Sequence, residues 1–157
     1  MIYTPFANKI MQLIAAKSKT LSGTGFCYLG FSSTTPNDDG SNFTEPDAST
    51  YPSYERIQLN VYTAMPYADV FGTVADGMVT NAAEFTTKKC QEEGGWPAFT
   101  HFGIFDSETA TTPIAGDWIT DPDGEVDEDG NYPHKTLTVP YGEVAIFEAG
   151  TLRLGLK

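Results

Sequence analysis

The pattern of hydrophobic and polar positions changes once along the chain, after the first twenty residues. Apolar residues there recur at the spacing of one helical face: Phe6, Ile10, Leu13 and Ile14. Thr4 is a suitable N-cap, and Pro5 suits the first helical position, where no N–H is needed. The pattern predicts a short N-terminal helix within residues 1–20. The helix packs on its own domain or docks on a partner protein, and the sequence leaves both open.

From residue 26 onward the pattern is typical of strands. Short apolar or alternating runs follow one another, separated by turn residues: 26–32, 54–61, 78–87, 96–105, 112–120, 135–139, 144–147 and 152–156. No helical pattern recurs between them, which argues against a βαβ fold. We therefore expect a mainly β protein, a single antiparallel β-sandwich (jelly-roll-like or Ig-like) over residues 26–157. With the helix it forms one structural domain, residues 1–157.

Residues 34–53 form a long polar stretch with turn chemistry throughout. A loop of about 20 residues is uncommon in a compact domain and is often functional. Tyr51 lies in this stretch and Tyr54 directly follows it, while Trp96 follows another polar stretch. They either bind sugars or pack in the core, and core packing is the favoured interpretation.

The balance of 9 basic and 21 acidic residues gives a net charge of −12. Such a charge argues against binding to nucleic acid or to an anionic membrane, both of which attract clustered Lys and Arg. It is also a simple source of solubility. No apolar run is long enough to span a membrane, and the N-terminus lacks the order of a signal peptide. We expect synthesis in the cytoplasm of the producing cell.

Residues that carry chemistry are few and share no motif. The two histidines are His101 and His134, and His101 lies in an apolar run where a structural role is the more common one. Neither a nucleophile elbow nor a phosphate-binding loop is present. We therefore expect no enzymatic activity, no catalytic residues and no cofactor.

The acidic stretch 121–131 is the one segment with ligand-like chemistry, since it holds six carboxylates in nine positions. Oxygen-rich clusters of this kind bind Ca²⁺. The calcium candidates are Asp123, Glu125, Asp127 and Asp129. The EF-hand pattern fails at its twelfth position, Thr136, so a solvated hairpin loop with no metal is the favoured interpretation.

The two cysteines, Cys27 and Cys90, share no motif spacing. Cys27 lies in an apolar run and is expected to be a small buried residue. Cys90 follows Lys88 and Lys89, a basic neighbourhood that could lower the pKa of its thiol. We expect two free thiols.

Several segments together resemble a widespread family of small virion proteins of tailed bacteriophages, often labelled tail-fibre-like or virion structural proteins. The stretch Thr100–Asp106 (T-H-F-G-I-F-D) carries most of the resemblance. The other matching segments occur in the family's order over nearly the whole chain: 6–14, 28–40, 44–46, 54–59, 79–85 and 147–154. Residues 66–76 and 121–131 are longer than is usual in the family.

The resemblance implies a β-sandwich that assembles on a phage particle, with His101 as a packing residue. The expected function is a capsid decoration or cement protein bound to the head shell. Its main partner would be the major capsid protein, and the state a homo-oligomer, with a trimer as one candidate. The alternative is a tail-fibre or baseplate component involved in host attachment. Either would be made in the cytoplasm of the bacterial host and end in the virion.

Overall fold

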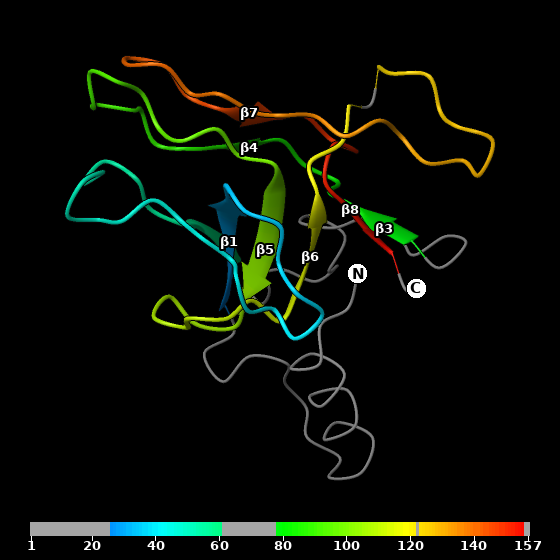
Figure 1. The fold of residues 1–157 in the computed structure, drawn as a ribbon, viewed down its shortest axis with the longest axis horizontal. Helices are drawn as coiled ribbons and strands as arrows, with labels where there is room; N and C mark the ends of the chain where they lie inside the picture. The colour runs from blue at the N-terminus through cyan, green and yellow to red at the C-terminus, as the bar shows by residue number, and fades with distance from the viewer. Residues whose placement is uncertain (1–25, 61–77, 122, 156–157) are drawn as a thin grey trace, which may run out of the picture.

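A computed structural model describes residues 26–60, 78–121 and 123–155 (Figure 1). These residues form eight short strands: β1 (Phe26–Ser32), β2 (Ile57–Asn60), β3 (Met78–Thr80), β4 (Phe85–Thr86), β5 (His101–Phe105), β6 (Ala115–Trp118), β7 (Ile146–Phe147) and β8 (Arg153–Gly155). Every pairing is antiparallel. The prediction of a mainly β, antiparallel protein is confirmed. The predicted helix of residues 1–20 lies outside the described residues, and the described ones hold no helix able to span a membrane.

A four-stranded sheet in the order β2-β1-β5-β6 forms the centre of the fold. β1 has the bounds that its apolar pattern predicts, and its residues from Leu29 to Ser32 are all buried. β5 is buried along its whole length. Strands that are covered on both faces consist of continuous apolar runs, and for this reason the sequence pattern predicted β1 and β5.

One face of the sheet supports the aromatic core. Leu29 and Phe31 of β1 lie opposite Ile104 and Phe102 of β5, so the four side chains share this face. The ring of Phe147 from β7 stacks on Phe31 with centroids 4.7 Å apart. The β4–β7 ribbon therefore packs against β1, although neither it nor the second two-stranded ribbon, β3–β8, shares a strand with the sheet.

The other face carries a row of glycines. Gly30 of β1 lies opposite Gly103 of β5, which lies opposite Gly116 of β6. A Cβ atom on Gly103 would lie 2.7 Å from the ring of Phe43, and one on Gly30 would collide with Glu45. The glycines thus leave room for side chains of the loop between β1 and β2, which covers this face.

The predicted strand 78–87 is interrupted between β3 and β4. The cause is Asn81, whose buried amide donates to the carbonyls of Ala83 and Glu148 and accepts from the N–H of Leu152. Backbone groups that would otherwise join a ladder bind this side chain instead. The predicted strand 135–139 is likewise reduced, to the single bridge Phe99↔Leu137 beside the bridge Thr120↔His134.

Candidate functional site

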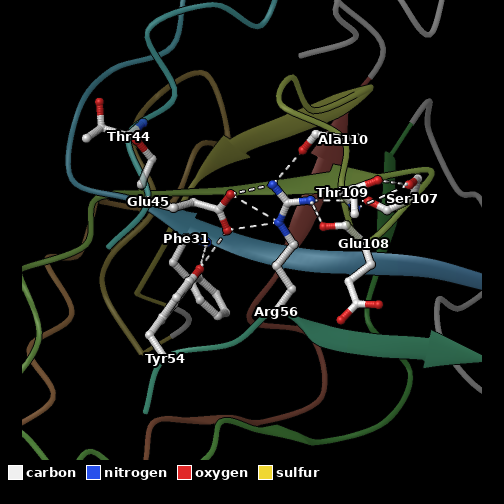
Figure 2. A network of polar contacts seen from close by, with 10 residues as sticks. Phe31, Thr44, Glu45, Tyr54, Arg56, Ser107, Glu108, Thr109 and Ala110 are labelled. Carbon is white, nitrogen blue, oxygen red and sulfur yellow. Dashed lines mark hydrogen bonds and ion pairs between the residues drawn. The ribbon is translucent and has the colours of Figure 1, made fainter. Parts of the chain in front are cut away.

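The most developed polar cluster lies where the β1–β2 loop, β2 and the β5–β6 loop meet (Figure 2). Its centre is the ion pair of Arg56 and Glu45, with Nη2 and Oε2 2.6 Å apart. Arg56 Nε adds contacts of 3.1 Å to both carboxylate oxygens, which makes the pair bidentate. Its side chains are only 12% and 19% exposed, so solvent screens the attraction weakly.

Arg56 also holds the β5–β6 loop. Its guanidinium donates to the carbonyl oxygens of Glu108 at 2.9 Å, Ala110 at 2.7 Å and Ser107 at 3.2 Å. The loop curls to present them, with the N–H of Ala110 bonded to the Ser107 carbonyl. The guanidinium carbon lies 3.4 Å from the centroid of the Phe105 ring, a cation–π contact.

Tyr54 connects this cluster to the sheet. The pairing of β1 with β2 ends at Leu29, and the hydroxyl of Tyr54 accepts the next free N–H, that of Phe31. The same hydroxyl donates to Glu45 at 2.9 Å. Burial, with the Glu45 carboxylate next, raises the pKa of Tyr54 well above its usual value. The hydroxyl therefore stays protonated and able to donate. The long loop that the sequence suggested as functional is thus anchored by Glu45 and Tyr54 at its C-terminal part.

Sequence reasoning had only part of this cluster. Tyr54 and the long loop drew attention in the sequence, but nothing in the spacing links Arg56 to Glu45. The glycine row was a usable signal, since three facing glycines in neighbouring strands indicate that another chain segment approaches closely.

A second cluster forms around Glu92. Its carboxylate accepts from the backbone N–H and hydroxyl of Ser53 and from the indole N–H of Trp96 at 2.9 Å. The bonds from Ser53, ahead of those from Trp96 and Cys90, lower the pKa of Glu92 to about 2. Trp96 and Tyr54 are buried, and Tyr51 packs partly buried against the core. Their favoured interpretation as core residues is confirmed.

Cys90 lies beside this cluster as a buried free thiol. Burial is the largest influence on it and raises the pKa of the thiol. The suggestion that Lys88 and Lys89 lower this pKa is wrong, because desolvation outweighs the attraction of two lysines that point to solvent.

His101 is enclosed in β5 and is 3% exposed. Its Nδ1 lies 2.8 Å from the Thr100 hydroxyl, and its Nε2 has no hydrogen-bond partner. Trp118 lies between the two histidines, with ring centroids 3.9 Å from His101 and 3.9 Å from His134. Burial above all lowers the pKa of His101 to about 4, and His134 adds to the effect while Asp117 opposes it. This environment fits the packing role that the resemblance implies.

The acidic loop closes on itself. Asp127 accepts from the N–H groups of Asp129 and Asn131 and from the Asn131 side chain, and Gly130 adopts φ +81°. The bonds from Asn131 are the main reason that the pKa of Asp127 is lowered. Within the part of the chain that the structure describes, no three His, Cys, Asp or Glu side chains gather as metal ligands. Calcium binding by Asp123, Glu125, Asp127 and Asp129, and its absence, remain untested predictions.

One open hollow is lined by residues of the Arg56 cluster and another by residues of the Glu92 cluster, and Glu55 and Lys88 line both. These two side chains form an exposed ion pair with nitrogen and oxygen 2.6 Å apart. The hollow at the Glu92 cluster is otherwise mostly polar, with Ser53 and Gln91, whereas the one at the Arg56 cluster is mixed, with Gln58 beside Ile57. The hollow at the Glu92 cluster therefore suits a hydrogen-bonding ligand better than an apolar one.

Together these features define a β-structural protein whose loops are anchored to the sheet by buried polar clusters. The family model described as "Podophage GP4 fiber I protein gp80" matches residues 2–129, and the chain belongs to this family. It is therefore a phage fibre-type structural protein and a virion component. No curated protein matches the chain. Of the two locations expected from the sequence, the match favours the tail fibre over capsid decoration.

Proposed function

We propose that the chain is a non-enzymatic structural subunit of a podophage tail fibre that binds other virion proteins. The match to a podophage fibre family over residues 2–129 is the observation that carries this proposal. The net charge of −12 supports protein partners over nucleic acid or an anionic membrane. The packing of the β4–β7 ribbon on the central sheet supports a β-sandwich as the fold class. The enclosed position of His101 favours a structural over a catalytic role.

Fractionated particles test this location. Heads and tails are separated from purified virions, and the chain is quantified in each by mass spectrometry against the major capsid protein. A tail protein follows the tail fraction at a copy number far below that of the shell subunit. Recovery with the heads, at a number close to that of the shell subunit, would instead support decoration of the capsid.

The proposal extends to host attachment through the two hollows beside the Glu92 and Arg56 clusters, above all the polar one that Gln91 lines. Their exposed hydrogen-bonding side chains are the support for this extension, since the buried Tyr54 and Trp96 offer no stacking surface. Binding of the purified protein to an array of bacterial surface glycans, lost in Gln91→Ala and retained in Asp123→Ala, would agree with it. Equal binding by the two variants would place attachment elsewhere.

A further inference from the structure

Exposed apolar side chains concentrate on one element of the described structure, the β4–β7 ribbon and the turn before it. The large exposed hydrophobic residues are Val126, Tyr141, Val144 and Ile146, of which the last three lie within six positions. Their exposed fractions are 61% for Tyr141, 40% for Val144 and 55% for Ile146. Clustered exposure of this kind marks an interaction surface more often than scattered single residues do.

The alternation of a strand explains why this face is separate from the core. Ala145 and Phe147 point inward and are 3% and 2% exposed, so Val144 and Ile146 point outward. Thr86 lies opposite Ile146 across the ribbon and is exposed as well. In Figure 1 the ribbon runs along the upper border of the described structure, with the central sheet on one side.

The balance of charge on this ribbon differs between its two ends. Glu84 and Glu148 directly flank the pair Phe85↔Phe147 at one end, and both are exposed. Lys88 and Lys89 follow β4 toward the other end and are exposed too, as is Glu143 beside them, so this end holds two basic groups and one acidic group. Acidic side chains close to one another repel, and the repulsion is relieved when a cation approaches.

We propose that this outer face of the β4–β7 ribbon binds the same face of a second copy of the chain, across a two-fold axis. In the antiparallel arrangement the lysine end of each copy meets the glutamate end of the other. Val144 and Ile146 of both copies then meet in the centre. A parallel arrangement would bring like charges together, so the charge pattern selects the orientation as well as the partner.

The competing contact of Lys88 is weak. Its ion pair with Glu55 is 61% and 54% exposed, and exposed pairs contribute about 0–1 kcal/mol. The exposed large apolar side chains of this face are only Tyr141, Val144 and Ile146 in the described structure, whereas a standard interface buries roughly 800 Å² per partner. We therefore expect the isolated chain to dimerise weakly and in a salt-dependent manner. Several copies held in one particle would associate more strongly because their effective concentration is high.

A charge-swap experiment on the full chain tests the proposal by sedimentation velocity over a range of protein concentrations at low salt. One variant carries Lys88→Glu and Lys89→Glu, and the other carries Glu84→Lys and Glu148→Lys. We expect the wild type to dimerise, each variant alone to stay monomeric, and an equal mixture of the two to recover the dimer. The control Asp123→Lys with Glu125→Lys makes the same net-charge change as the second variant but should dimerise like the wild type.

Circular dichroism checks that all variants are folded. A wild type that stays monomeric at millimolar concentration would overturn the proposal. So would a mixture that fails to recover the dimer, or a trimer that is unaffected by either variant. The experiment uses isolated protein, so its failure would leave the location in the tail fibre untouched.

Discussion

Replacement of Arg56 by Ala tests whether the Arg56–Glu45 cluster holds the loops onto the sheet. The change leaves a largely buried carboxylate without its cation, and breaking a buried pair costs about 3–5 kcal/mol. The two side chains are still 12% and 19% exposed, so we take about 3 kcal/mol, the lower end of that range, for loss of the ion pair. Loss of the contact with the Phe105 ring adds about 0.5–2 kcal/mol. We therefore expect the free energy of unfolding to fall by about 3–5 kcal/mol.

Lys88 provides a matched control, since its ion pair with Glu55 has the same 2.6 Å separation but is more than half exposed. Lys88→Ala should cost about 0–1 kcal/mol. Urea unfolding followed by tryptophan fluorescence measures both variants. Arg56→Lys keeps the charge but loses the planar fork, so its stability should fall between those of the wild type and Arg56→Ala. A loss below about 1 kcal/mol for Arg56→Ala, or one no larger than for Lys88→Ala, would refute the claim that the buried Arg56–Glu45 pair stabilises the fold.

Three further predictions concern single positions. Gly103→Ala should destabilise by about 1–3 kcal/mol, because its Cβ would meet Phe43 at 2.7 Å, whereas Gly94→Ala, with no atom within 4 Å, should change the melting temperature little. His101 binds protons more readily when unfolded (pKa 6.5) than when folded (pKa about 4), so its contribution to the free energy of unfolding falls as the pH drops from about 6.5 to about 4. The loss of unfolding free energy is at most about 3 kcal/mol. Urea titrations across this pH range should show that the stability of His101→Gln depends less on pH than that of the wild type. An equal pH dependence would contradict the lowered pKa of His101. Cys90 should react with a thiol reagent only on unfolding, so that the native protein shows at most one fast thiol, and two fast thiols would contradict its burial.

The sequence predicted best those strands whose own residue types indicate their burial. β1 and β5 are apolar runs covered on both faces; β1 has its predicted bounds, and β5 is the second half of the predicted run 96–105. The break at Asn81 did not, because it depends on carbonyl and N–H groups near residues 147–152. Strand 78–87 was therefore predicted too long, and strand 135–139 is reduced to the bridge Phe99↔Leu137.

The polar clusters were beyond pattern analysis for a similar reason. Arg56 finds carbonyl groups more than fifty positions away, and the distance along the chain says nothing about which loop will approach. Cys90 shows the opposite error, since sequence neighbours suggested an electropositive site and burial decided the chemistry. The acidic loop forms a turn at Asp127 and Gly130, and whether it binds a metal stays a prediction.

The central claim is the place of this chain in a tail fibre, and a reconstruction of the phage particle by electron cryomicroscopy tests it most directly. The account predicts density for the four-stranded sheet and its two ribbons in a fibre attached to the tail. Density for the same fold on the outer surface of the head shell, with none in the tail fibres, would contradict it.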